Sequence, residues 1–243
     1  MWMAANGRAP SSINLRLSAI AHAHHRRGVT SPTNSKAVRD TKTEIMRALN
    51  SRPRNAKSEF TPQQVRAILA GLPDHTLRGR RDRALISLAC GIGLHRSEVA
   101  RLEMADLGRV GDEPCIRIRR DGTDRPSTTV PLAIGGDDYL RAWCTAANLV
   151  QGAIFRRIRR GDHLTSERLS CQAVALIIKK GAALIDLNPA NYSGESPRKS
   201  FIGWGLAAGY DLETIREYSR LSSLAALSRY VRRKGGHPGD RFL

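Results

Sequence analysis

Three short segments of this sequence hold the side chains that could act on a phosphate group. They are Gly93-Leu94-His95-Arg96-Ser97-Glu98, then Ser193-Gly194-Glu195-Ser196-Pro197-Arg198, and finally Ser223-Leu224-Ala225 followed by Arg229-Tyr230-Val231. An arginine grips a phosphate through two parallel hydrogen bonds, whereas a lysine acts more as a point charge. Alone, each segment is a weak signal, because Arg198 is one of many arginines and Tyr230 has the pattern of a half-buried helix residue.

Taken together, the three segments resemble the tyrosine recombinases of the phage-integrase family. The family's motifs are Gly-Leu-Arg-x-Ser-Glu-Leu with a later Leu and Asp, Ser-Gly-His-Ser-Leu-Arg with a later Phe, and His-x-Ser-Leu before a Tyr. This chain has Leu102, Asp106 and Phe201 at the later positions. The order and separations match, with a β-hairpin expected between the first two segments, and the resemblance covers about residues 60 to 234.

The resemblance implies a reaction that joins DNA without a metal or nucleotide cofactor. A tyrosine oxygen attacks a backbone phosphate and forms a 3′-phosphotyrosine, which a 5′-hydroxyl of a second strand can reseal. By this resemblance Tyr230 is the nucleophile and Arg198 is a phosphate clamp. Because a tyrosine has an ordinary pKa of about 10, it needs help to lose its proton. The implied partners are double-stranded DNA and further recombinase subunits on that DNA.

Four positions depart from the family's pattern. His95 stands where the first clamp arginine belongs, and Gly122 falls near the position of a proton-donating lysine in the hairpin. Glu195 replaces a histidine, and we expect its carboxylate to repel phosphate unless Arg198 neutralises it. Leu221 replaces a late histidine or tryptophan and cannot donate a proton. Loss of one clamp donor typically costs about 3 kcal/mol, so we expect very slow or absent cleavage by the chain alone.

The composition supports a polyanionic partner. The 243 residues include 40 Lys and Arg against 22 Asp and Glu, a formal net charge of +18. Each phosphate that a basic side chain neutralises releases counterions from DNA, so nucleic acid is the first candidate partner, ahead of an anionic membrane surface. Beside the clamp, the residues expected to contact DNA are Arg96, Arg119, Arg120, Arg125, Lys179, Lys180 and Lys199.

The compartment that the sequence favours is a reducing cytosol. Cys90, Cys115, Cys144 and Cys171 form neither a disulfide framework nor a metal knuckle. Met1-Trp2-Met3 begins no signal peptide, because no apolar stretch follows. The longest apolar stretch, residues 84–94, is too short to span a bilayer. We therefore expect a cytoplasmic, nucleoid-associated protein without a membrane partner.

Periodicity predicts a mainly α-helical fold with one small antiparallel β-hairpin sheet. Thr61, Pro62 and Gln64 form the signature of a helix start with a capping box. The hairpin is expected to pair residues 115–119 with 128–132. The expected helices cover residues 11–25, 35–49, 61 onward, 81–91, 97–106, 138–148, 170–184, 197–208, 211–221 and 223–232.

Four regions follow from this pattern. Residues 1–50 are similar to the end of the family's helical core-binding (SAM-like) domain, and we expect them to form a partial domain that lacks its first part. Two such helices need another surface to cover them. Residues 51–59 are expected to be a basic linker, 60–234 a catalytic-like domain with the tyrosine-recombinase fold, and 235–243 a tail.

Two functions stay open at this point. One is a family member that acts in DNA integration or excision, by itself or with partner subunits that supply the missing groups. The other is a non-catalytic DNA-binding regulator or scaffold at recombination sites. A basic RNA- or ribosome-associated protein is a third class, which the three-segment match disfavours.

Overall fold

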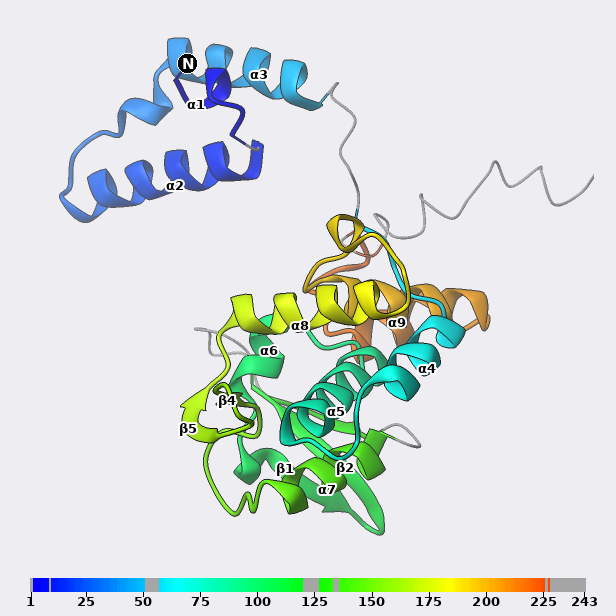
Figure 1. The fold of residues 1–243 in the computed structure, drawn as a ribbon. Helices are drawn as coiled ribbons and strands as arrows, with labels where there is room; N and C mark the ends of the chain where they lie inside the picture. Colours follow the sequence, from blue (N-terminus) through cyan, green and yellow to red (C-terminus); the bar gives the residue numbers. More distant parts are fainter. Residues whose placement is uncertain are drawn as a thin grey trace, which may run out of the picture. The chain divides into compact units, whose positions relative to one another are not determined.

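The computed structural model describes residues 2–8, 10–50, 57–119, 127–132, 136–225 and 227 (Figure 1). The chain divides into two compact units, residues 1–55 and residues 56–243. Each unit is described on its own below.

The first unit is a small helical array. Its elements are α1 (Trp2–Ala5), α2 (Pro10–Arg26), the 3-10 helix η1 (Pro32–Asn34) and α3 (Lys36–Asn50). The two long helices confirm the predictions within one residue at each end. Among the described residues of this unit, Ile13 is the one buried hydrophobic side chain, and Leu15 and Ile20 are exposed. The unit therefore buries too little apolar surface to be stable by its core alone.

The first helix of the second unit has the capping residues that the sequence predicts. In α4 (Pro62–Gly71), Thr61 Oγ1 accepts from the Gln64 N–H at 3.1 Å, and Gln64 Oε1 accepts from the Thr61 N–H at 2.9 Å. The predicted capping box is confirmed. The next helix, α5 (Leu77–Gly91), starts four residues earlier than predicted, because Thr76 caps it by accepting from the Gly79 N–H.

Helix α5 forms the middle of the core. It packs against α7 (Gly136–Ala146), α9 (Ser196–Ala207) and α4, and Figure 1 shows it between α8 (Cys171–Leu184) and α7. The core contains fully buried side chains from several elements, among them Leu85, Leu88, Trp143 and Phe155. This contiguous core gives the site described below a rigid support.

Two small antiparallel sheets lie in this unit. The first has the order β1 (Leu107–Val110), β2 (Glu113–Ile118), β3 (Thr128–Pro131), with Ile116 opposite Val130. The β2–β3 pairing confirms the predicted hairpin. The prediction missed β1, which has no alternating apolar pattern, and the separate pair β4 (Arg156–Ile158) and β5 (Leu164–Arg168), which is very short.

The helix predicted over residues 97–106 is wrong in its length. Helix α6 covers only Arg96–Arg101, and a 3-10 turn, η2 (Met104–Asp106), follows. The chain leaves the helix because its backbone bonds to another segment: the Leu102 carbonyl accepts from Ile154 N–H, and Met104 N–H donates to the Gly152 carbonyl, both at 2.9 Å. These partners lie about 50 residues away along the chain, outside any helical pattern.

The start of the second unit is fastened to helix α9. Phe60 N–H donates to Ser200 Oγ at 2.8 Å, and Trp204 Nε1 donates to the Phe60 carbonyl at 2.9 Å. The Phe60 ring stacks on Tyr192, which follows η3 (Pro189–Asn191), with centroids 4.3 Å apart. Helix α9 is therefore held on one side by the incoming chain and on the other by α5.

Helix α10 (Leu212–Tyr218) ends three residues before its predicted end, because Arg220 adopts a left-handed backbone conformation with φ 56°. Most of the last predicted helix, residues 223–232, and the tail lie outside the described residues. The four cysteines are free. Within the described ranges, no helix has the length and apolar character needed to cross a membrane.

Candidate active site

The first predicted motif forms a tight turn that leads into α6. Gly93 has φ 63°, and a Cβ there would lie 2.7 Å from the Phe201 ring, so glycine is required. His95 then caps α6: its Nδ1 accepts from the Ser97 N–H at 3.2 Å, and its own backbone N–H donates to Glu98 Oε2 at 2.7 Å. The turn thus places the Gly93 carbonyl and the Glu98 carboxylate close together.

Arg198, the predicted phosphate clamp, is bound at this turn. From α9 its Nε donates to the Gly93 carbonyl at 3.0 Å, and its Nη2 donates to Glu98 Oε2 at 2.6 Å. The side chain is only 10% exposed. A guanidinium has five N–H donors, and no described residue is assigned to Nη1. The geometry therefore fixes the guanidinium and leaves one edge that could meet an oxyanion.

A second arginine, which the sequence analysis missed, enters the same cluster. Arg220 Nη2 donates to the Gly93 carbonyl at 2.8 Å and to Glu98 Oε2 at 3.1 Å. Its left-handed backbone costs a non-glycine residue about 1–2 kcal/mol, so the surrounding bonds must hold it there. In the sequence, the signal that pointed to a basic partner was Glu98 in the first motif, because a buried carboxylate needs a positively charged neighbour.

The two arginines determine the charge state of Glu98. Burial by itself raises the pKa of this carboxyl. The charges of Arg198 and Arg220, with the hydrogen bonds from Arg220 and from the His95 N–H, outweigh burial and hold the pKa below its ordinary value. Glu98 is therefore an ionised carboxylate between two guanidiniums at neutral pH.

His95 and Glu195 form a separate pair beside this cluster. His95 Nε2 lies 2.5 Å from Glu195 Oε1, and His95 Nδ1 lies 2.7 Å from Ser97 Oγ. The side chains are 32% and 41% exposed. Arg198 makes its direct ion pair with the buried Glu98 rather than with Glu195, and His95 is the direct partner of Glu195.

The pKa of Glu195 follows the same balance. Burial raises it, but the hydrogen bond and charge of His95, and the charges of Arg198 and Arg96, hold the pKa below the ordinary value. Both ring nitrogens of His95 are engaged in this arrangement. As it stands, the pair presents a carboxylate and no spare imidazole donor to a phosphate.

The remaining predicted site residues are placed as follows. Leu221 packs against a small apolar cluster that includes Ile202 and Ile215. Arg96 is exposed, with its stem against Gly194. Arg119 donates to Asp106 at 2.8 Å, Lys199 donates to the Lys57 carbonyl at 2.6 Å, and Lys179 and Lys180 lie on α8. Gly122, Arg120, Arg125 and Tyr230 lie outside the described residues.

Some of the basic runs serve the fold rather than a surface. Arg81 is buried and bound to Asp82 at 2.7 Å, and Arg78 donates to the carbonyls of Ile158 and Arg159. The run of basic residues in the sequence could not reveal the role of Arg78, because its partners lie about 80 positions further along the chain.

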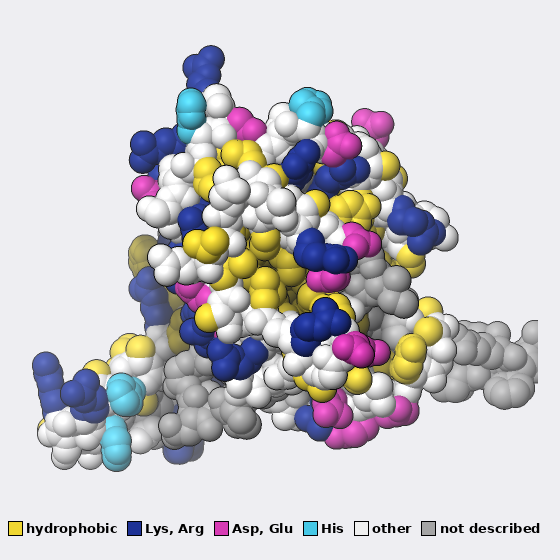
Figure 2. Space-filling model, turned by 90° about the horizontal axis from the view of Figure 1, so that it is seen from below, with side chains coloured by type: hydrophobic (Ala, Val, Ile, Leu, Met, Phe, Trp, Pro, Cys, Tyr) yellow, Lys and Arg dark blue, Asp and Glu magenta, His cyan; other side chains and the backbone are white. Residues whose placement is uncertain are grey.

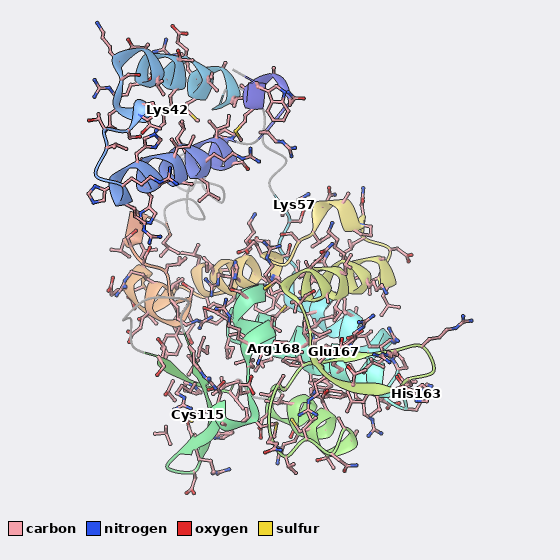
Figure 3. The ribbon with its side chains drawn as sticks, turned by 90° about the vertical axis from the view of Figure 1, so that its left-hand side faces the viewer. Lys42, Lys57, Cys115, His163, Glu167 and Arg168 are labelled. Carbon is pink, nitrogen blue, oxygen red and sulfur yellow. The ribbon has the colours of Figure 1, made fainter. Side chains whose placement is uncertain are left out.

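The β4–β5 pair carries both signs of charge. Glu167 lies 3.1 Å from Arg157, and Arg168 donates to Glu103; Figure 3 marks Glu167, Arg168 and His163 on this part of the chain. Figure 2 shows a face on which Lys and Arg side chains alternate with acidic ones around a hollowed apolar patch. The basic residues behind the net charge of +18 are thus not all gathered on one surface that could follow a DNA backbone.

Comparison with known proteins defines the class. The chain is similar to an integrase/recombinase xerD homolog of Selenomonas ruminantium, with 27% identity over 91% of this chain and 68% of that protein. It is 28% identical to tyrosine recombinase XerD of Xanthomonas axonopodis pv. citri, over 74% of this chain and 59% of that protein. The chain thus spans about two thirds or less of these relatives' length.

Among solved structures, the Tn1549 transposon integrase in complex with transposon right end DNA superposes with a TM-score of 0.67. It has 13% identity over 98% of this chain and 79% of that one, which shows that the folds are alike: mainly helical with a small antiparallel sheet. The model of the phage integrase family matches residues 58–237. The chain belongs to the phage integrase family, as the three sequence motifs predicted.

Proposed function

We propose that this protein binds duplex DNA and takes part in site-specific recombination. In this proposal Arg198 binds the backbone phosphate that is attacked, and Tyr230 is the nucleophile. Tyr230 would form a 3′-phosphotyrosine, and no metal or nucleotide is needed for that step. The observation that carries the proposal is the guanidinium of Arg198, fixed by Gly93 and Glu98 with one edge unassigned among the described residues. A pre-positioned donor of this kind stabilises charge on a phosphate oxygen.

The similar proteins support DNA as the partner in this proposal. One structural neighbour is a transposon integrase in complex with transposon DNA. We propose that this chain likewise occupies DNA in the nucleoid, with further copies or other recombinase subunits, and that residues 1–50 act as a helical core-binding domain. Arg96, Arg119, Arg120, Arg125, Lys179, Lys180 and Lys199 are the proposed DNA contacts around the clamp.

Cleavage by the chain alone is proposed to be impaired. Both ring nitrogens of His95 are engaged with Ser97 and Glu195, so the first clamp position has no spare donor. Glu195 adds a negative charge where the family's pattern has a histidine. Leu221 lies in an apolar cluster and cannot donate. Catalysis would then depend on partner subunits or on a rearrangement of the His95–Glu195 pair.

One alternative has a specific observation behind it. Glu195 occupies His95 next to the clamp, so the site lacks a donor that cleavage needs, while Arg198 remains able to bind a phosphate. This favours, as the second candidate, a non-catalytic DNA-binding regulator or scaffold at recombination sites.

A trapping experiment separates the two functions. A binding site is first selected from random DNA, and a nicked version of it, from which the product of cleavage cannot be resealed, is incubated with the protein. We expect salt-dependent binding but little covalent product. Abundant product that disappears in Tyr230→Phe would show an active enzyme. Absence of binding at low salt would contradict the DNA-binding proposal itself.

If trapping is weak, the family's groups can be restored together as His95→Arg, Gly122→Lys, Glu195→His and Leu221→His. Recovery of covalent product in this fourfold variant supports an intact scaffold with a degraded site. A variant that binds DNA and still forms no covalent product favours the regulator or scaffold.

A further inference from the structure

Every N–H of the Arg220 guanidinium is used within the protein. Nε donates to Glu98 Oε1 at 3.3 Å. Nη1 donates to the carbonyls of Ile92 at 3.2 Å and Tyr218 at 2.6 Å. Nη2 donates to the Gly93 carbonyl and to Glu98 Oε2. These five bonds match the five donors that a guanidinium has.

Arg220 therefore cannot act as a replacement phosphate clamp. Its side chain is 1% exposed, and a contact with phosphate would break at least one internal bond. Arg198 differs, because only two bonds to described residues are assigned to it and its side chain is 10% exposed. The two guanidiniums share Glu98 and the Gly93 carbonyl, but within the described part of the chain Arg198 alone has N–H groups to which no partner is assigned.

The contribution of Arg220 is its charge. Glu98 and Arg198 alone would form a neutral pair, and the clamp would attract phosphate weakly. With Arg220 the three side chains carry a net charge of +1. The neighbouring His95–Glu195 pair adds no net positive charge in either state of the imidazole. A charge acts on a phosphate several ångströms away without touching it, most strongly where water is excluded.

We propose that Arg220 is a positioning residue of the phosphate site, which cancels the charge of Glu98 so that the guanidinium of Arg198 stays net positive toward DNA. This proposal rests on the proposed DNA-binding function. In this proposal Arg220 supplies the positive charge that is missing at the first clamp position, where His95 stands. Arg220 does not replace the direct contact of that clamp arginine with the phosphate.

The test measures binding of a fluorescein-labelled 20-base-pair duplex of arbitrary sequence by anisotropy over a range of salt concentrations. We expect Arg220→Met to weaken binding about three- to tenfold near 0.1 M salt and to lower the salt slope by up to about 0.9. Adding Glu98→Gln to that variant removes the uncancelled carboxylate and should restore affinity to within about twofold. A double variant as weak as Arg220→Met would overturn the proposal, because Arg220 would then act only as a structural staple.

Arg220→Lys separates charge from the five-bond geometry and covers the case in which Arg220→Met does not fold. It keeps the charge and loses most of the bonds, so we expect near-normal binding. A folded Arg220→Lys variant that binds three- to tenfold more weakly than wild type would contradict the proposal.

The matched control is the exposed pair on α10, where Arg216 Nε donates to Glu213 at 2.9 Å. Arg216→Met and its double with Glu213→Gln should bind DNA alike, since Glu213 lies outside the site. Circular dichroism checks that each variant is folded. Failure of the wild-type protein to bind at low salt would reject the DNA-binding function itself rather than the role of Arg220.

Discussion

The two halves of the candidate site are built differently. Glu98 lies with its side chain 12% exposed between Arg198 and Arg220, and its contacts come from three segments of the chain. Glu195 is 41% exposed, and its direct side-chain partner among the described residues is His95, which is itself 32% exposed. The first half is enclosed and multiply bonded, and the second is an open pair.

This difference separates what must stay fixed from what can move. A buried charge that loses a partner is left uncompensated at high cost, whereas an exposed ion pair contributes only about 0–1 kcal/mol. We therefore expect the enclosed half to keep its geometry when DNA binds. In the open half, His95 can exchange Glu195 for a phosphate at little cost, so we expect the site to rearrange there.

The largest expected effect is on stability, from Glu98→Gln. This change leaves two adjacent buried guanidiniums without their carboxylate, and it should lower the free energy of unfolding by about 3–5 kcal/mol. Glu195→Gln should lower it by less than about 1 kcal/mol. Urea unfolding followed by circular dichroism measures both. Equal losses would break the distinction between the enclosed and the open half.

The local elements of this fold could be predicted, because their causes lie within a few residues. The capping box of Thr61 and Gln64 is one such case, and the apolar spacing of α2 and α3 is another. The β2–β3 hairpin was legible from alternation on both sides of a turn.

The centre of the site could be predicted only in part, for a physical reason. The motif named Arg198, but its binding to Glu98 joins residues 100 positions apart, and that of Arg220 joins residues 122 apart. The left-handed backbone conformation of Arg220 could not be predicted locally, because arginine has no preference for that conformation. The pairing of Glu195 with His95 also depends on tertiary packing, which residue spacing along one helix does not encode.

A smaller effect is expected on DNA affinity, from Glu195→Gln. The carboxylate lies beside the clamp and repels a phosphate, so its removal should tighten binding to the labelled duplex by about two- to fivefold near 0.1 M salt. Glu213→Gln, a surface carboxylate removed in the same way on α10, should leave affinity unchanged. Weaker binding in Glu195→Gln would mean that Glu195 is needed to orient His95 toward DNA, and that the open half is part of the binding geometry.

The smallest expected effect is in the acid limb of the stability curve. Glu98 and Glu195 both have pKa values below the ordinary value of 4.5, because charged neighbours outweigh burial. A carboxyl with a lowered folded-state pKa contributes stability that is complete above its unfolded-state pKa and is lost as the pH falls through the folded-state pKa. The groups that face Glu98 are Arg198, Arg220 and the His95 N–H, and those that face Glu195 are His95, Arg198 and Arg96.

The urea midpoint of the wild-type protein should therefore fall as the pH drops below about 4.5. A glutamine side chain does not titrate, so the Glu195→Gln variant should start slightly below wild type at pH 7 and converge with it in acid. The convergence is expected to be small, because solvent screens a pair that is this exposed. A gap between the two curves that stays constant from pH 7 to acid would mean that Glu195 is not stabilised as a carboxylate by His95, and the open half would then need another explanation for its geometry.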